Sequence, residues 1–434
     1  MPTNHGIPMP VEGDAKAPRV LYIGDHAIGF RNSSGITLAN LYADYPREAI
    51  TQYTPHAPGV PAVGLVVSVP RVESLLTAPF AAAYRGFLRT RRGGGSPSPH
   101  NSVKVERQSR LARLAGHLAA AADLAPVRLP LRTRKLLRKG EPEVIHAIIG
   151  RMRTLRRVLK AARVLGIPVV PHLTDDWIGT IFPNGELGGR ARARALRLVG
   201  ELMERSPVLL VIGDAMAAEY GHRYGKPCVV AAAAVDPADF APAYASHSGP
   251  RRLLYVGSPH VGRAEMADRV ALFAKDRGWE VVVHPLLPEL WRQWSSVVTI
   301  AEQLPSEDVP AALCRADALL FPESLDPGVA DYTRLSVSTK LSQFIASGRP
   351  ILAIGPAGQG SIEELRHNAP RAIVLDGVDD ARLDAGFGYL EAHLDPAPAA
   401  VPEKYLASRV RAAMTSALAA AVGGRTSLTR ASTA

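Results

Sequence analysis

The sequence predicts an α/β protein made of two doubly wound, Rossmann-like domains. The chain opens with an apolar strand at residues 19–23, which leads through a Gly-rich loop into a helix. The same pattern restarts at Arg252, directly after a segment rich in Pro, Ala and Ser. A further run of strand, turn, helix and strand occupies residues 317–356. Alternating strands and helices are typical of parallel sheets, so we expect one such sheet in each half.

The composition agrees with a globular protein of two or three domains. The chain has 434 residues, of which 47% are apolar and 21% are charged, and a single core rarely grows to this length. Cys228 and Cys314 are the only cysteines, which excludes a disulfide framework and favours a reduced, cytoplasmic setting. The N-terminus lacks the features of a signal peptide, and no apolar run approaches the roughly 20 residues of a membrane span.

Positive charge is concentrated in residues 80–165. This segment carries 20 Lys and Arg against four acidic residues, a net charge of +16, whereas the whole chain carries +11. Basic residues alternate with Leu, Ala and Phe at 83–92 and 129–139, and basic amphipathic segments suit an anionic membrane surface. We expect no nucleic acid partner, because the segment offers few aromatic residues, such as Tyr84 and Phe87, for base stacking. A merely solvated basic face is the alternative.

The loop at 24–35, GDHAIGFRNSSG, follows the first strand and leads into a helix from about Ile36. It has neither the GxGxxG spacing of a dinucleotide site nor the GxxxxGK spacing of an ATP-type phosphate loop. The rest of this half is predicted to contain a basic helix at 151–165 and strands at 144–148, 168–171 and 208–212.

The second half begins after the Pro-rich linker. It is predicted to contain strands at 252–256, 280–283, 318–321 and 351–354 and a helix at 265–277. For the chain as a whole we expect a disordered N-terminus at 1–18, an N-terminal domain at 19–240, a linker at 241–250, a C-terminal domain at 251–400, a helix at 401–424 and a flexible tail at 425–434.

Residues 317–356 predict a site for an anion. Ser336 to Thr339 can supply hydroxyl caps for a helix that follows the strand at 318–321. A helix that opens just after a strand points free N–H groups and the positive end of its dipole at a ligand. Lys340 adds a full positive charge. The alternative is an ordinary βαβ unit with a solvated Lys340.

Three polar residues, His172, Asp175 and Asp176, follow the strand at 168–171, on the edge where open α/β sheets bind ligands. The carboxylates are candidates for orienting a substrate or for general-base catalysis. Alternatively, His172 is a structural hydrogen-bond partner and an Asp before Trp177 caps a turn. The adjacent pair of Asp residues is not a DxD metal motif, so we predict no metal.

Several segments resemble, in this order, the motifs of B-type fold glycosyltransferases, and most closely glycosyltransferase family four and its relatives. In the first half these are EVIHAIIG, IPVVPHLTDDW and the segment from VLLVIGDAMAAEYGHRYG to AVDPADF. In the second half they are LLYVGS, LPSEDVPAALCRADALLFP and STKLSQFIASGRPILAIGP. The resemblance covers residues from about 19 to about 376.

The resemblance implies two domains that face each other across a cleft, with a late helix that returns toward the N-terminal domain. A nucleoside-diphosphate sugar would bind to the C-terminal domain and a hydroxyl acceptor to the N-terminal domain, with no metal and no cofactor. Arg263 and Lys340 would clamp the diphosphate, and His172 would contact the donor sugar. Further donor contacts would come from Gly257, Ser258, Leu304, Glu323, Ser338, Thr339 and Gln343, and the first loop would contribute Asp25, His26, Arg31, Asn32 and Ser33.

The chain departs from the family at the helix that follows Lys340. Many members have a Glu that hydrogen-bonds the ribose, five residues before the Gly at the helix end, and a second Glu eight residues earlier. These positions are Gln343 and Leu335 here, and Glu323 is a candidate to contribute instead. The missing pair bears on whether the family's retaining mechanism applies, although we expect retention rather than inversion.

The sequence therefore predicts a cytoplasmic glycosyltransferase, peripheral to the inner face of the plasma membrane, with a lipid-linked or polymeric acceptor. A sugar-nucleotide epimerase of the same fold is one alternative. A non-catalytic protein that binds an anionic polymer or membrane through its cationic face is another.

Overall fold

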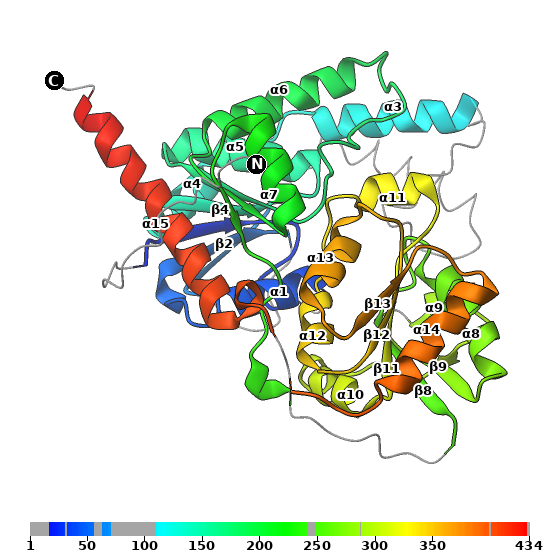
Figure 1. The fold of residues 1–434 in the computed structure, drawn as a ribbon. Coiled ribbons are helices and arrows are strands. Elements are labelled where there is room, and N and C mark those ends of the chain that lie inside the picture. Colours follow the sequence, from blue (N-terminus) through cyan, green and yellow to red (C-terminus); the bar gives the residue numbers. More distant parts are fainter. Residues whose placement is uncertain are drawn as a thin grey trace. The chain divides into compact units, whose positions relative to one another are not determined.

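The structure, a computed structural model, describes residues 17–30, 33–55, 63–70, 110–240, 249–286, 288–398 and 401–431. The chain divides into two compact units (Figure 1). Among the described residues, unit 1 holds residues 17–232 and 408–431, and unit 2 holds residues 233–407.

Unit 1 is built on a parallel sheet of seven strands in the order β3-β2-β1-β4-β5-β6-β7. Most of its strands are buried along their whole length, as expected where helices cover both faces of a sheet. The strands are β1 (Val20–Ile23), β2 (Ile50–Thr54), β3 (Leu65–Ser68), β4 (Val144–Ile148), β5 (Val169–Leu173), β6 (Leu209–Val211) and β7 (Cys228–Val230). The helices are α1 (Ser33–Leu41), α3 (Arg110–Leu124), α4 (Leu131–Lys139), α5 (Met152–Leu165), α6 (Arg190–Glu204), α7 (Asp214–Tyr224) and α15 (Ala407–Ala431).

Unit 2 repeats this plan with a parallel sheet of six strands in the order β10-β9-β8-β11-β12-β13. In Figure 1, α12 and α13 lie on one side of this sheet and α8 and α14 on the other. The strands are β8 (Arg251–Gly257), β9 (Trp279–Pro285), β10 (Thr299–Ile300), β11 (Ala318–Pro322), β12 (Ile351–Ile354) and β13 (Ala372–Leu375). The helices are α8 (Arg263–Lys275), α9 (Pro288–Trp294), α10 (Val309–Arg315), α11 (Pro327–Thr333), α12 (Leu341–Ala346), α13 (Gly360–Asn368) and α14 (Asp380–Ala392).

Both sheets reverse their strand order at a central pair, β1 and β4 in unit 1 and β8 and β11 in unit 2. Ligands of doubly wound folds bind outside the carboxyl ends of the strands at such a switch point. The predicted α/β class with two doubly wound sheets is thus confirmed, and each unit has one position where a site is expected.

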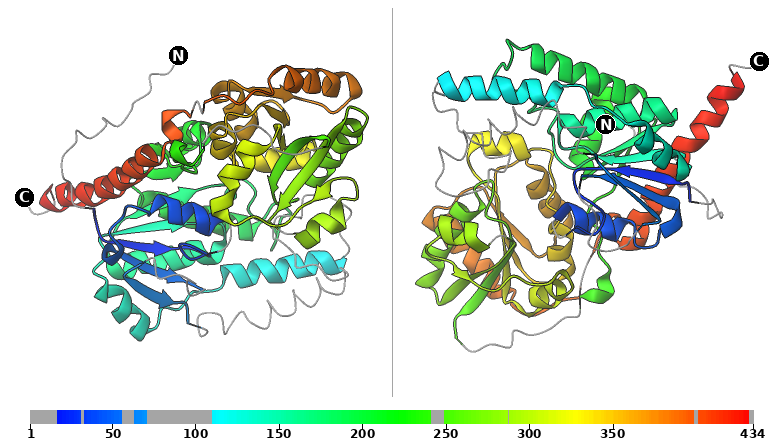
Figure 2. Two further views of the ribbon diagram at one scale, coloured as in Figure 1. Left: turned by 90° about the horizontal axis from the view of Figure 1, so that it is seen from below. Right: turned by 180° about the vertical axis from the view of Figure 1, so that it is seen from behind.

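The C-terminal helix belongs to unit 1 (Figure 2). Arg411 of α15 donates from Nε to the Asn40 carbonyl oxygen at 2.7 Å and from Nη1 to the Asp44 carboxylate at 2.7 Å. The helix begins at Ala407, not near 401, and its backbone is helical to Ala431. It passes Gly423 and Gly424 because neither has the positive φ that commonly ends a helix.

Several predictions fall on residues that lie outside the described part of the chain. These are the disorder of residues 1–16, the amphipathic segment at 83–92 and most of the linker, residues 241–248. Among the described residues, no helix is both long enough and apolar enough to cross a bilayer.

Candidate functional site

A narrow pocket lies in unit 2, at the carboxyl ends of β8 and β11. It therefore occupies the switch point of the second sheet. The pocket combines two cationic side chains, two hydroxyls and a largely aromatic wall. It is lined by Tyr255, Arg263, Phe321, Pro322, Ser338, Lys340 and Phe344.

Arg263, the first residue of α8, forms an ion pair with Glu323, which directly follows β11. Its Nη2 atom lies 2.8 Å and 3.1 Å from the two carboxylate oxygens of Glu323. The Glu323 side chain is 2% exposed and that of Arg263 is 18% exposed. The carboxylate therefore fixes one edge of the guanidinium group while the side chain as a whole still lines the pocket.

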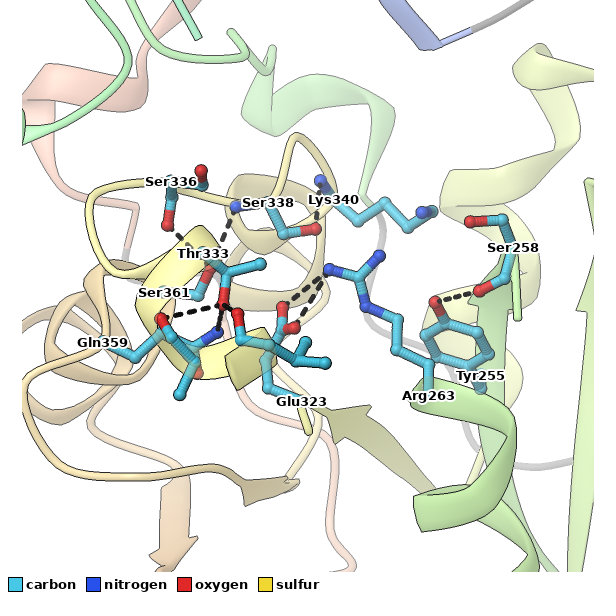
Figure 3. A network of polar contacts seen from close by, with 12 residues as sticks. Tyr255, Ser258, Arg263, Glu323, Thr333, Ser336, Ser338, Lys340, Gln359 and Ser361 are labelled. Atoms are coloured by element: carbon cyan, nitrogen blue, oxygen red, sulfur yellow. Dashed lines mark hydrogen bonds and ion pairs between the residues drawn. The ribbon is translucent and has the colours of Figure 1, made fainter. Parts of the chain in front are cut away.

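Lys340 is the second cation of the pocket, and its side chain extends toward Ser258 (Figure 3). Its Nζ atom lies 5.9 Å from the centroid of the Tyr255 ring, within the range of a cation–π interaction. Burial lowers the pKa of Lys340 to about 8, the positive charge of Arg263 adds to the shift, and Glu323 opposes it. An anion bound beside the ammonium would offset this cost.

Gly257 allows Lys340 to approach the end of β8. A Cβ atom at this position would come 2.5 Å from the Lys340 Nζ atom and 2.7 Å from the Tyr255 hydroxyl. Its φ of +152° is also rarely adopted by residues with a side chain. The carbonyl of Gly257 accepts a hydrogen bond from Trp291 Nε1 at 2.8 Å, which fixes the strand end.

The segment before α12 is held by the start of α13. The Ser338 backbone N–H donates to Ser361 Oγ at 3.0 Å, and Ser361 Oγ donates to the Ser336 carbonyl at 3.3 Å (Figure 3). Of the hydroxyls at 336–339 that were predicted to cap the helix, that of Ser338 accepts a hydrogen bond at 3.5 Å from the Lys340 N–H. Lys340 is the N-cap, and its own side chain makes no cap hydrogen bond. Since α12 has only six residues, its dipole contributes little, and the side-chain charges dominate the site.

None of the remaining predicted donor residues is among those that line the pocket. Ser258 is half-buried, and its carbonyl accepts a hydrogen bond from the Tyr255 hydroxyl at 3.1 Å. Thr339 and Gln343 are half-buried on either side of Lys340 in the chain. Leu304 is half-buried in the segment between β10 and α10 and does not line the pocket.

Several residues of the site, Tyr255, Ser361 and Gln359 among them, were missed by the sequence analysis. Tyr255 lies within the LLYVGS segment but gave no signal that its ring would face Lys340. Ser361 and Gln359 come from the start of α13, and Gln359 Nε2 donates to Thr333 Oγ1 at 2.7 Å. These contacts join segments that are distant in the sequence, so spacing could not reveal them.

In unit 1, His172 is fully buried within β5. Its Nε2 atom lies 3.0 Å from the Ala231 carbonyl oxygen, and its ring stacks on that of His146 with 5.6 Å between centroids. Burial lowers the pKa of His172 to about 4, so the ring is neutral near pH 7. His146 is equally buried and pairs with the Tyr42 hydroxyl at 2.6 Å. Contact of His172 with a donor sugar stays a prediction, and its burial gives no support to it.

The two Asp residues after β5 differ in their surroundings. Asp176 is buried, and its Oδ1 atom accepts hydrogen bonds from the Tyr220 hydroxyl at 2.6 Å and from the Gly179 N–H at 3.0 Å. These contacts agree with the alternative interpretation, in which the Asp carboxylate caps a turn. Asp175 is half-buried, and Thr174 donates to it at 3.3 Å.

The loop after β1 is only partly described, since Arg31 and Asn32 lie outside the described residues and the side chain of Ser33 is not described either. Asp25 is half-buried and accepts a hydrogen bond from Thr154 at 2.5 Å. The His26 ring stacks on Phe30 with 5.6 Å between centroids. Among the described residues, no three acidic, His or Cys side chains form a group that could hold a metal ion.

No protein-family model matches the sequence, and no curated protein matches it. Several solved structures share the fold. The structure of HepE from Anabaena in complex with UDP and glucose has a TM-score of 0.52 at 14% identity, with 96% of this chain and 100% of that chain covered. The α,α-trehalose 6-phosphate synthase of Burkholderia multivorans has a TM-score of 0.52 at 12% identity, with 95% and 98% covered.

At these identities the likeness concerns the fold, and it extends over nearly the whole of each chain. Both neighbours are glycosyltransferases of the B-type fold. The chain therefore has the B-type glycosyltransferase fold, as the resemblance of its motifs indicated. Membership of glycosyltransferase family four in particular stays a prediction.

Proposed function

We propose that the protein is a glycosyltransferase that moves a sugar from a nucleoside-diphosphate sugar to a hydroxyl acceptor. The observation that carries this proposal is the presence of Arg263 and Lys340 in one pocket with Ser338, at the switch point of the second sheet. Two cations beside a hydroxyl suit a diphosphate. HepE, which has the same fold, has been solved in complex with UDP and with UDP-glucose.

The reaction needs positive charge where these residues lie. The acceptor oxygen forms a bond to the sugar carbon while the bond from that carbon to the phosphate oxygen breaks, so negative charge grows on the leaving diphosphate. Fixed cations stabilise that charge more in the transition state than in the bound donor, which accelerates the transfer. In our proposal, Arg263 and Lys340 supply this stabilisation without a metal or another cofactor, and Ser338 and Thr339 donate hydrogen bonds.

We propose retention of configuration, in which the leaving phosphate oxygen takes the proton of the acceptor hydroxyl. On the acceptor side we favour Asp175 over Asp176 for orienting the acceptor, because Asp176 is already bonded to Tyr220 and Gly179. An inverting enzyme would instead need such a carboxylate as general base. The stereochemistry of the product, determined by NMR, distinguishes the two.

Titration of UDP into the protein tests the donor site. Replacing Lys340 by Gln removes one charged contact, and we expect the dissociation constant to rise about 10- to 100-fold, equal to about 1.4–2.7 kcal/mol. Lys275→Gln is the matched control, because this exposed lysine lies at the far end of α8 and does not line the pocket. If neither UDP, GDP, ADP nor TDP binds at millimolar concentration, the transferase proposal fails.

Two rival functions predict different products. An epimerase would convert the nucleotide sugar with no acceptor present, whereas a transferase needs the acceptor for turnover beyond slow hydrolysis. A non-catalytic binding protein would bind anionic polymer or membrane and leave the nucleotide sugar intact. Incubation with UDP-sugars, with and without acceptor, followed by product separation decides among the three.

We further propose that the protein binds the inner, anionic face of the plasma membrane through α4, and that the acceptor is lipid-linked or polymeric. This nine-residue helix carries five basic residues, and Leu131 at its start is 74% exposed. Basic side chains around exposed Leu suit an anionic lipid surface. Vesicle binding should require anionic lipid and weaken with salt, and Leu131→Gln should reduce it. Equal binding to neutral and anionic vesicles would contradict this proposal.

A further inference from the structure

The helices α5 and α6 of unit 1 lie parallel and in contact. Each connects neighbouring parallel strands, β4 to β5 and β5 to β6, so both run in the same direction along the sheet. An ion pair fixes their register near the C-terminal ends. Arg163 Nε donates to Glu201 Oε1 at 2.7 Å, and a second contact joins the same two side chains.

The same register brings two positive charges together closer to the N-terminal ends. Seven residues are about two turns of an α-helix, so the residues two turns before Arg163 and Glu201 also face each other. These residues are Arg156 and Arg194. Arg153 precedes Arg156 by three residues and lies on the same face of α5. The groove between the helices thus contains a pair of like charges at this position, whereas two turns further along it contains the ion pair of Arg163 and Glu201.

No acceptor within the described residues neutralises Arg156. Its side chain is half-buried, and its Nη1 atom is inaccessible to solvent and has no hydrogen-bond partner there. Burial lowers the pKa of Arg156, and the charges of Arg194, Arg153 and Arg163 lower it further. A charge removed from water without a counter-ion is costly, so a structure retains one only where something compensates for it.

Two acidic residues of the described part of the chain, Glu201 and Asp123, lie near this groove. Glu201 binds Arg163 and also accepts from Arg205 Nε at 3.2 Å. The helix α3, which packs on both α5 and α6 (Figure 2), brings Asp123, whose charge acts on Arg153 of the groove and on Arg151. Arg153 thus has a carboxylate nearby, whereas Arg156 has no counter-ion among the residues that the structure describes.

We infer that the α5–α6 groove at Arg153, Arg156 and Arg194 binds a phosphate group. Planar guanidinium groups bind phosphate oxygens through paired hydrogen bonds, and several of them around one phosphate share its charge. The phosphate belongs either to a free phosphorylated ligand or to the headgroup of an anionic lipid. This site lies on helices of unit 1, is distinct from the pocket of unit 2, and does not depend on the proposed transferase function.

Inorganic phosphate and thermal unfolding test the site. All proteins compared carry Lys340→Gln, so that phosphate at the unit 2 pocket contributes little. At ten times the dissociation constant, phosphate should raise the unfolding temperature by about 4 °C. Arg194→Glu should abolish this shift and raise the unfolding temperature without phosphate, because the new carboxylate faces Arg156 as Glu201 faces Arg163. The matched control Arg47→Glu changes an exposed arginine of unit 1 and should keep the shift.

The source of the phosphate is decided with vesicles. If a lipid headgroup occupies the groove, Arg194→Glu lowers binding to vesicles that contain phosphatidylglycerol about tenfold more than Arg47→Glu does. If the ligand is free, only the response to inorganic phosphate is lost. Arg156→Gln should reproduce whichever loss is found. The inference is overturned if Arg194→Glu and Arg47→Glu behave alike in both assays.

Discussion

The affinity for UDP should fall as the pH rises through 8, and Lys340 should cause this fall. The pKa of Lys340 is lowered to about 8 in the unliganded protein because its ammonium is removed from water next to Arg263. A bound diphosphate favours the charged form, which returns the pKa toward the ordinary value of about 10.4. Binding above pH 8 therefore requires the uptake of a proton, and each further pH unit makes that proton harder to obtain.

The size of the effect follows from the two pKa values. With a free pKa of about 8, the dissociation constant of UDP should rise about tenfold from about pH 7 to about pH 9, which equals about 1.4 kcal/mol. The second ionisation of a phosphate group lies near pH 6, so the charge of UDP changes little in this window. The pH dependence of folding stability has the opposite sign to that of UDP affinity. The unfolded chain binds the proton more tightly, so stability should increase as the pH rises from about 8 to about 10.

Calorimetric titrations of UDP at several pH values, in buffers with different ionisation enthalpies, measure both the affinity and the number of protons taken up. Wild type and Lys275→Gln should share one slope, and Lys340→Gln should bind weakly with an affinity that hardly changes with pH. A flat profile in the wild type would refute the reasoning. An unchanged slope in Lys340→Gln would show that another group takes up the proton.

Three substitutions test other contacts of the two units. Glu323→Gln should lower the free energy of unfolding in urea by about 3 kcal/mol, because it removes the carboxylate partner of Arg263. The same substitution should tighten UDP binding severalfold, and weaker binding would show that the carboxylate positions the guanidinium. Gly257→Ala should lower both the unfolding temperature and the UDP affinity, because its Cβ atom would come 2.5 Å from Lys340 Nζ. An unchanged affinity would show that this glycine does not affect the pocket. Tyr220→Phe should lower the free energy of unfolding by about 2 kcal/mol, because the hydrogen bond to Asp176 is lost, and should leave UDP binding unaffected. An unchanged stability would contradict a structural role for that hydrogen bond.

The strands were the most predictable part of the fold. Val144–Ile148 and Ile351–Ile354 have the bounds expected from the sequence, because both are continuous apolar runs next to turn residues. The strand β2, Ile50–Thr54, was missed because its sequence, ITQYT, has two polar residues in its centre. Gln52 is nevertheless fully buried, and its side chain accepts a hydrogen bond from the Ile28 N–H at 2.8 Å. Such a partner cannot be identified from local sequence.

The helices around the pocket were less predictable. The segment between β11 and α12 was expected to be a turn, but it contains α11. Its start signal was present, since Asp326 precedes Pro327 and its side chain accepts from the N–H groups of the next two non-proline residues. The residues that follow were predicted to be helix caps, and the Ser338 hydroxyl does accept from the Lys340 N–H. The backbone groups of Ser336 and Ser338 are in addition bonded to Ser361 of α13, a contact that local sequence does not reveal.

The charges of the pocket were predicted, but their pairing was not. Arg263 and Lys340 were both assigned to the diphosphate, and both line one pocket. The bond from Arg263 to Glu323 spans 60 residues, and no spacing rule covers that distance. His172 is the opposite case, in which the sequence suggested a feature that the structure does not have. Its position after an apolar run suggested an accessible site residue, whereas the strand continues through it and buries it.

The position of the carboxylate has a consequence for donor recognition. In the family that the motifs resemble, a Glu on the helix after Lys340 binds the ribose, and here that position holds Gln343. The carboxylate of Glu323 contacts a lining residue of the pocket and is turned toward Arg263. A neutral amide gains less than a carboxylate from a ribose hydroxyl, since hydrogen bonds to charged groups are about twice as strong. The diphosphate should therefore carry a larger share of the binding energy than the nucleoside, and discrimination among UDP, GDP and ADP should depend on contacts to the base rather than to the ribose.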